Sequence, residues 1–245
     1  MSTRERPAFY ALSAGGWRDY VTLLHPPYTL WHLSYVAIGA CTVAVVNFGY
    51  LGWSLLAFFG AVGLGAHALD ELRGRPLGTR IPSWMLVAIA TVGLAGAVTL
   101  GILGAMRVSP WLGVFIGVGV FIALAYNLEW FGGAFHSDLW FALGWGAFPA
   151  LTGAFAQTGR LTIAAITVAA ACAALSAAQR VLSTPVRRLR RNAVAIGGNV
   201  RYDDGTEQRL DNAWLRATPE QALRLLSLAV PLFAAAMVAA AVARR

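Results

Sequence analysis

The sequence lacks lysine entirely and carries little charge of either sign. All 19 basic residues are arginine, and charged residues make up 12% of the 245 positions, about half the usual share in soluble proteins. Hydrophobic residues make up 58%. This composition excludes a disordered chain and an ordinary soluble domain, because one soluble core of this length contains far fewer apolar residues.

Cysteine and the common catalytic motifs are also scarce or absent. Cys41 and Cys172 both fall inside apolar runs, where cysteine acts as a small buried hydrophobe, so we expect no disulfide or zinc framework. The sequence contains no G-x-S-x-G, H-E-x-x-H, Walker-type or C-x-x-C motif. Hydrolase, zinc-protease, NTPase and thiol-redox functions therefore have no support in its motifs.

Long apolar runs make up most of the sequence. Because a membrane-spanning helix needs about 20 mostly apolar residues, the sequence predicts an all-α membrane bundle of about seven transmembrane helices. The expected spans are 29–48, 51–72, 83–105, 109–130, 137–157, 160–183 and 219–243. The chain then divides into a cytoplasmic or interfacial N-terminal segment (1–28), a six-helix membrane core (29–183), a cytoplasmic loop with a predicted hairpin (184–218) and a seventh transmembrane helix (219–245).

The arginines lie between the apolar runs, which favours a membrane protein over a nucleic-acid partner. Fifteen lie on the side of the N-terminus, and four, Arg107, Arg160, Arg244 and Arg245, lie on the other. The positive-inside rule then predicts a multi-pass protein of a bacterial-type inner or plasma membrane, with its N-terminus in the cytoplasm and its C-terminus outside. All 11 carboxylates and all 4 histidines fall on or near the same side as the N-terminus. We therefore expect any chemistry in a cavity that faces the cytoplasm.

The first candidate cluster ends the second expected span, in the run GAHALDELRGRPLGTRIP. On a helix, His67, Asp70 and Glu71 project within one arc of about 100°. Two carboxylates favour magnesium, whereas the imidazole favours zinc, iron or manganese. The structural alternative is a solvated helix end with a carboxylate paired to Arg73 or Arg75.

The second cluster returns to the same membrane face in the run YNLEWFGGAFHSD. Glu129, His136 and Asp138 are its titratable residues, and His136 and Asp138 are further candidate metal ligands. Asp138 with Ser137 also has the form of a helix start, where a carboxylate interacts favourably with the helix dipole.

The third cluster lies in the run SAAQRVLSTPVRRLRR. Arg180, Arg187, Arg188, Arg190 and Arg191 could bind a diphosphate through charge-assisted hydrogen bonds. For the last four, fixing the topology and touching anionic lipid head groups is the structural alternative. We expect Arg180 to face the interior, because it lies nearer the membrane.

The order of these features resembles the UbiA superfamily of intramembrane prenyltransferases. HALDELRGRPLGTRI has the layout of the family's acidic motif and the Arg-Pro segment that follows it, with Asp70, Glu71 and Arg75 at the matching positions. The segment from Tyr126 to the PALTGA run that begins at Pro149 is similar to the family's fourth and fifth helices. The resemblance implies a helical membrane enzyme that transfers a prenyl group from an isoprenoid diphosphate, with magnesium, in a cytoplasmic cavity.

The chain departs from the family's pattern at its second acidic motif, where AQRVLSTPVRRLRR stands instead. It also has fewer expected spans than the family usually has. One metal on Asp70 and Glu71 would then act with arginines that hold the diphosphate directly. The substrate-binding residues expected on this basis are Arg75, Tyr126, Glu129, Arg180, Arg187 and Arg188.

Two other functions fit the same residues. The first is a membrane enzyme with a mixed imidazole and carboxylate metal site that acts on a lipid by redox or hydrolytic chemistry. Its ligands would come from His67, Asp70, Glu71, Glu129, His136 and Asp138. The second is a non-catalytic subunit that binds a lipid or another membrane enzyme. The sequence leaves the oligomeric state and the acceptor open.

Overall fold

The chain is mostly helical in the computed structural model, which describes residues 6–244. Arg4 and Arg245, counted in the charge asymmetry above, lie outside the described residues. The elements are α1 (Trp17–Leu23), α2 (Pro26–Ala40), α3 (Phe48–Phe58), η1 (Phe59–Ala66), α4 (His67–Leu72), α5 (Ser83–Arg107), α6 (Leu112–Asn127), α7 (Trp130–Gly133), α8 (Asp138–Ala142), η2 (Leu143–Ala147), α9 (Phe148–Thr158), α10 (Ile163–Arg191), β1 (Asn199–Arg201), β2 (Glu207–Arg209) and α11 (Asn212–Ala243). The two η elements are π-helical segments inside longer helices.

Within residues 6–244, five helical stretches are long and apolar enough to cross a membrane: Phe48–Leu72, Ser83–Arg107, Asp138–Thr158, Ile163–Arg191 and Asn212–Ala243. The predicted helical class is therefore confirmed, and the chain has the make-up of a membrane protein. The helices in the other two expected spans are shorter, at 15 residues in α2 and 16 in α6, against the ~20 residues that a span needs. The count of seven spans stays a prediction.

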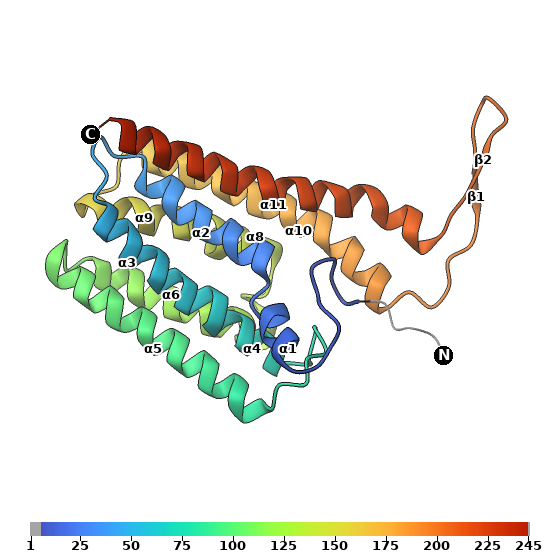
Figure 1. Cartoon of the computed structure of the whole chain (residues 1–245), viewed down its shortest axis with the longest axis horizontal. Coiled ribbons are helices and arrows are strands. Elements are labelled where there is room, and N and C mark those ends of the chain that lie inside the picture. The colour runs from blue at the N-terminus through green and yellow to red at the C-terminus, as the bar shows by residue number, and fades with distance from the viewer. Residues whose placement is uncertain (1–5, 245) are drawn as a thin grey trace.

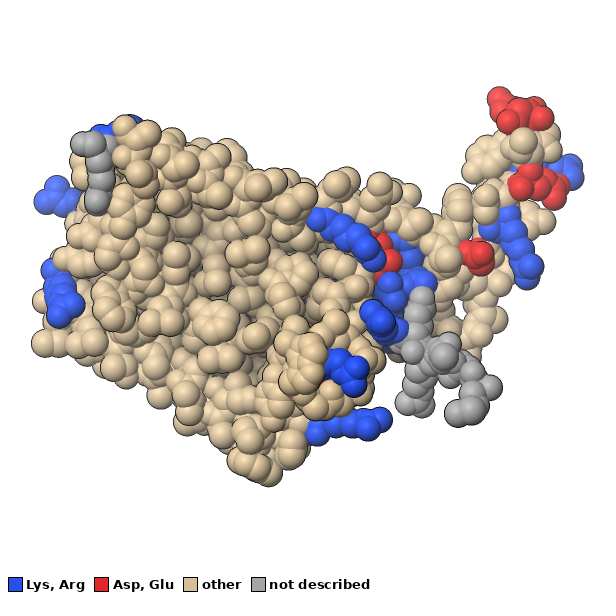
Figure 2. All heavy atoms as spheres, viewed as in Figure 1, with Lys and Arg blue, Asp and Glu red and all other residues tan. Residues whose placement is uncertain are grey.

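Charged side chains gather at the two ends of the molecule, with a wide uncharged surface between them (Figure 2). The end that holds α1, the loop of residues 73–82 and the C-terminal part of α10 is called the polar end here. The chain's C-terminus lies at the opposite end (Figure 1), which also holds the loop between α5 and α6. A helical bundle with charge at both ends and an uncharged surface between them on the face seen in Figure 2 suits a bilayer.

The two longest helices extend further than the sequence predicted. Residues 184–191 continue α10, and α11 begins at Asn212 rather than at residue 219. The extensions pack against each other, because Asn212 Nδ2 of α11 donates to the carbonyl oxygen of Leu189 of α10 at 2.9 Å. The loop therefore shrinks to residues 192–211, and within it Val200 of β1 pairs with Gln208 of β2 in an antiparallel hairpin.

Close backbone contact between α2 and α9 fixes the centre of the bundle. A Cβ atom added at Gly39 would lie 2.0 Å from the carbonyl oxygen of Ala150, and one at Gly153 would lie 2.2 Å from that of Val36. Only glycine permits this approach, as in other membrane helix pairs. The contact holds α2, with its inward-facing His32, against the segment that carries Trp145.

Candidate functional site

A cavity of about 390 Å³ lies at the polar end and is called the polar cavity here. It lies between residues 7–10, the N-terminal half of α2, α4, the C-terminal end of α6, the loop before α8 and the C-terminal half of α10. Its polar and titratable lining residues are Tyr10, His25, Tyr28, His32, His67, Asp70, Arg73, Tyr126, Asn127, Glu129, His136, Gln179, Arg180, Ser183, Arg187 and Arg191.

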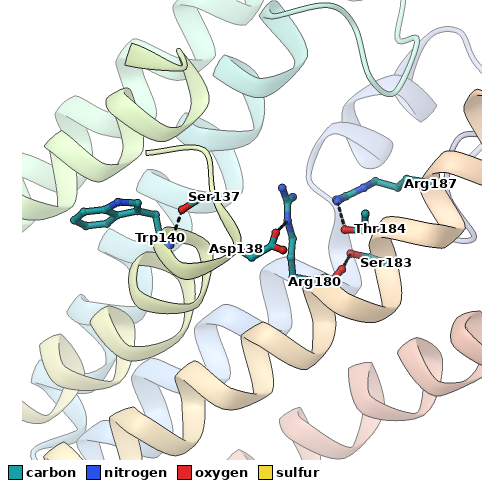
Figure 3. Close-up of polar contacts among 7 residues, drawn as sticks. All are labelled: Ser137, Asp138, Trp140, Arg180, Ser183, Thr184 and Arg187. Carbon is teal, nitrogen blue, oxygen red and sulfur yellow. Dashed lines mark hydrogen bonds and ion pairs between the residues drawn. The ribbon is translucent and has the colours of Figure 1, made fainter. Parts of the chain in front are cut away.

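Three arginines of α10 form one wall of this cavity. Arg180, Arg187 and Arg191 are spaced seven and four residues apart, which places them on one face of the helix. Arg180 Nε donates to Asp138 Oδ1 at 2.7 Å, and Arg187 Nη2 donates to Thr184 Oγ1 at 3.1 Å (Figure 3). Three guanidinium groups along one wall make it strongly attractive to an anion.

Asp70 lies on the cavity wall formed by α4. Its carboxylate accepts no hydrogen bond from any residue between positions 6 and 244. It therefore faces the cavity as an acidic group available to a cation or to a donor on a ligand.

Glu71 does not line the polar cavity beside Asp70, so the two carboxylates do not form the shared site that the sequence predicted. Its side chain is fully buried and turned to the loop of residues 73–82, where it accepts hydrogen bonds from Leu77 N at 2.9 Å, Thr79 N at 2.9 Å and Thr79 Oγ1 at 2.8 Å. Successive residues on a helix point about 100° apart, and the loop folds back over the side that Glu71 occupies. Glu71 anchors the loop instead of lining the cavity.

Histidines occupy the side of the cavity nearest α2. The rings of His25 and His67 stack with centroids 4.2 Å apart, and the hydroxyl of Tyr10 lies 2.7 Å from His25 Nδ1. Burial lowers the pKa of His25 well below its ordinary value, and His67 acts in the same direction, so His25 is neutral. Burial likewise raises the pKa of Tyr10. His136 stacks on Tyr126 at 4.4 Å and donates from Nδ1 to its carbonyl oxygen.

Three buried polar atoms on cavity-lining residues have no hydrogen-bond partner within residues 6–244: His25 Nε2, Tyr126 Oη and Gln179 Oε1. A buried polar atom without a partner costs about 1–3 kcal/mol, so most such atoms in folded proteins are paired. Three of them around one cavity indicate a site prepared for a polar ligand. Sequence analysis missed Gln179, whose only signal was a polar amide in an apolar helix.

The other expected site residues lie outside the cavity or on its rim. Arg75 and Arg188 do not line it, and Arg75 instead donates to Ile81 O at 2.5 Å and Ser83 Oγ at 2.8 Å. Glu129 lines the cavity but pairs with Arg73 at 2.9 Å. Asp138 reaches the cavity only through Arg180, and its side chain is 75% exposed.

The expected metal ligands do not all converge. Of the five, His67, Asp70 and His136 line the polar cavity, whereas Glu71 and Asp138 face elsewhere. Within residues 6–244, no group of three or more His, Cys, Asp or Glu side chains is arranged to hold a metal ion. Any ion at Asp70 would need oxygen ligands from a second source, such as a bound phosphate.

The segment before α1 forms part of the lining of the polar cavity, which sequence analysis did not foresee. Tyr10 and its neighbours Pro7, Ala8 and Phe9 are lining residues. The guanidinium of Arg224 lies 5.1 Å from the centre of the Phe9 ring. The segment is thus held from both α2, through His25, and α11.

A second, apolar cavity of about 180 Å³ lies between α3, η1, α5, α6, η2 and α9, and its lining includes the exposed side chains of Trp53 and Leu103. It extends from Tyr50 and Arg107, at the end opposite the polar cavity, to Val62 and Trp145. Val62 and Trp145 also line the polar cavity. The two cavities therefore have this pair of buried residues in common.

Comparisons of the chain with protein-family models, with curated proteins and with solved structures find no match. The residues and cavities described above are therefore the basis for assigning a function.

Proposed function

We propose that this chain is a UbiA-like membrane enzyme that binds an isoprenoid diphosphate in the polar cavity and transfers its prenyl group to an acceptor. The observation that carries the proposal is the convergence of Arg180, Arg187 and Arg191 with Asp70 on one cavity. Positive and negative groups facing each other across a cavity suit a diphosphate that carries a divalent cation.

The arginine wall would bind the diphosphate oxygens. Guanidinium groups match phosphate geometry with paired N–H donors. Gln179 and Tyr126 supply further polar atoms beside the same wall, and the Tyr126 hydroxyl can donate to a phosphate oxygen. Asp138 would hold Arg180 in place through the 2.7 Å ion pair at the cavity rim.

Asp70 fits a magnesium ion that arrives with the substrate. Magnesium is commonly bound by one or two carboxylates together with substrate phosphates. Asp70 lines the cavity and has no side-chain hydrogen bond or ion pair with residues 6–244, whereas Glu129 pairs with Arg73. A bound magnesium ion would stabilise the negative charge that develops on the departing diphosphate. His67 and His136 lie in the same cavity and would favour a transition metal.

The transfer breaks the bond between the first allylic carbon and the diphosphate oxygen, and the electron pair leaves with the diphosphate. The allylic cation then bonds to a nucleophilic carbon or oxygen of the acceptor, which releases a proton. Arg187 and its neighbours stabilise the leaving charge. The apolar and aromatic side chains of Val62, Phe141 and Trp145 line the same cavity and would keep water from the cation.

The same proposal includes a topology. The chain would cross a bacterial-type inner membrane seven times, with α2 and α6 as short spans and the polar end in the cytoplasm. The excess of arginine at that end supports this orientation.

The test is binding and turnover of geranylgeranyl diphosphate by the chain in lipid nanodiscs. Arg187→Gln should weaken binding about tenfold or more, the expected loss of a hydrogen bond to a charged group. Asp70→Asn should remove the magnesium dependence of diphosphate release when membrane-lipid extract supplies the acceptor.

Arg188→Gln is the matched control for Arg187→Gln, because Arg188 is the next residue on α10 and does not line the cavity. Its binding should equal that of the wild type. Equal losses in both variants, or no binding of any allylic diphosphate by the wild type, would overturn the proposal. Binding without diphosphate release from any lipid extract would instead favour a non-catalytic lipid-binding subunit.

A further inference from the structure

Helix α1 turns its apolar face outward. Trp17 and Tyr20 are 70% and 41% exposed, whereas Asp19 and Thr22 on the opposite face are buried. A surface helix that faces water shows the reverse pattern, with polar side chains outside and apolar side chains against the core. An outward apolar face on a short helix is typical of a helix that lies at a membrane surface.

The position of α1 places this face beside the start of a membrane helix. Leu23 of α1 lies in one buried cluster with Leu69 of α4 and Leu86 of α5. Helix α5 begins at Ser83 and is long and apolar enough to cross a membrane, and Trp84 in its first turn is 67% exposed. Tryptophan and tyrosine are enriched where membrane helices leave the hydrocarbon layer. The bilayer boundary that surrounds the start of α5 therefore also lies beside α1.

The buried position of Asp19 leaves the surface around α1 positively charged. Asp19 is the only carboxylate between residues 6 and 69, and its oxygens accept hydrogen bonds from the backbone amides of Gly15 at 2.8 Å and Arg80 at 2.9 Å. The second of these bonds holds Arg80 beside α1. The side chains of Arg18 and Arg80 are exposed, and neither has a hydrogen bond or ion pair in the part of the chain that the structure describes.

Five exposed side chains form this surface, which is called the interfacial patch here: Trp17, Arg18, Tyr20, Arg80 and Trp84. We propose that the interfacial patch binds the head groups of anionic phospholipids in the leaflet at the polar end. The aromatic rings would lie between head groups and acyl chains, and the two guanidinium groups would bind lipid phosphates. The inference goes beyond the proposed function and does not depend on it, because no residue of the patch lines the polar cavity.

An anionic phospholipid is the partner that fits both kinds of side chain. The rings of Trp17 and Trp84 suit the boundary between head groups and acyl chains, and a phosphate group accepts paired N–H donors from the guanidinium of Arg18 or Arg80. Phosphatidylglycerol offers its phosphate without a compensating positive charge. The choline group of phosphatidylcholine, by contrast, repels a neighbouring arginine. We therefore expect the patch to select phosphatidylglycerol over phosphatidylcholine.

The experiment measures quenching of tryptophan fluorescence by brominated lipids in nanodiscs. Brominated phosphatidylglycerol is titrated into phosphatidylcholine nanodiscs, and brominated phosphatidylcholine into phosphatidylglycerol nanodiscs. The contribution of Trp17 is the difference between the wild type and Trp17→Phe, which keeps an apolar ring. Phosphatidylglycerol should quench Trp17 at a lower lipid fraction than phosphatidylcholine does. Arg18→Gln and Arg80→Gln should each raise the fraction of phosphatidylglycerol needed for half-quenching about fivefold, the effect of one arginine at an anionic surface.

Arg107→Gln is the matched control, because Arg107 is an exposed arginine in the last turn of α5, at the opposite end of the molecule. It should leave the quenching of Trp17 unchanged. If both lipids quench Trp17 of the wild type equally, α1 touches the membrane without recognising an anion and the inference is wrong. If neither lipid quenches Trp17, the patch faces water or another protein, and the inference is wrong as well.

Hydrogen exchange provides a test that needs no substitution. The backbone amides of α1 should exchange more slowly in phosphatidylglycerol nanodiscs than in phosphatidylcholine nanodiscs, because a helix held by lipid opens less often. The β1–β2 hairpin, which contains no residue of the patch, is the internal reference. Its amides should exchange at the same rate in both. Equal exchange of the α1 amides in the two kinds of nanodisc would overturn the inference.

Discussion

The carboxylates on the two faces of α4 have opposite hydrogen-bonding surroundings. On the loop face, Glu71 is fully buried and accepts three hydrogen bonds. On the cavity face, Asp70 lies among groups such as His25 and Gln179 that keep buried polar atoms without partners within residues 6–244. Two neighbouring acidic residues of one motif thus have different tasks.

The difference separates residues that hold the fold from residues prepared for a ligand. Paired buried groups add stability, whereas unpaired ones lower it until something binds. Substitutions of paired groups on the loop face should therefore lower the stability of the protein. Substitutions of unpaired groups on the cavity face should instead weaken ligand binding and leave stability unchanged or higher.

The largest expected effect is on the loop face. Glu71→Ala leaves the amide groups of Leu77 and Thr79 and the Thr79 hydroxyl without their acceptor. We expect a loss of roughly 2–4 kcal/mol in the free energy of unfolding. Thermal unfolding in detergent should show a Tm several degrees lower.

Asp70→Asn is the control on the cavity face of the same helix. It should leave the Tm close to that of the wild type, because the carboxylate accepts no hydrogen bond from residues 6–244. If the two variants lower the Tm equally, the contrast between the faces is lost.

Much of the helical framework could be predicted from the sequence. Each expected span contains a helix in the structure, because runs of about 20 apolar residues have few alternatives to a helix in a membrane. The meeting of Asp70 and Arg180 at one cavity also follows from the topology, since both lie where apolar runs end on the same side.

The facing of individual side chains could not be predicted in this way. Whether Glu71 faces the polar cavity or the loop of residues 73–82 depends on how that loop folds back. No local sequence pattern specifies this. The close contact of Gly39 with α9 likewise depends on a partner more than 100 residues away in the sequence. Gln179 belonged to no motif, so only its position in three dimensions reveals it.

Acid should destabilise the protein through His25 on the cavity side. The pKa of His25 is lowered by burial, so below about pH 6.5 the unfolded chain binds a proton that the folded chain does not. Stability is then complete above that pH and falls as the pH drops, by up to about 1.4 kcal/mol per pH unit from this group. In His25→Gln, the Tm should fall less steeply between pH 7.5 and pH 5.5.

Tyr10→Phe is the control for the acid response, because it removes the hydroxyl that contacts His25 Nδ1 but leaves His25 buried. It should lower the free energy of unfolding by about 1 kcal/mol at every pH, and the Tm with it. The decrease in Tm between pH 7.5 and pH 5.5 should stay as in the wild type. Parallel curves for the wild type and His25→Gln would remove His25 from the explanation.

The smallest effect, and the one with the opposite sign, concerns Gln179. Methionine has a similar volume and no unpaired acceptor, so Gln179→Met should raise the free energy of unfolding by up to about 1 kcal/mol while weakening diphosphate binding. Gln157→Met, at the opposite end of the molecule, is the matched substitution. Gln157 Nε2 is also buried without a partner within residues 6–244, but its Oε1 accepts a hydrogen bond from Asn47 N at 2.8 Å, which the substitution removes. It should lower the Tm. A higher Tm with weaker binding at position 179 alone would mean that the cavity holds its polar groups for a ligand, whereas a lower Tm in both variants would assign Gln179 to the scaffold.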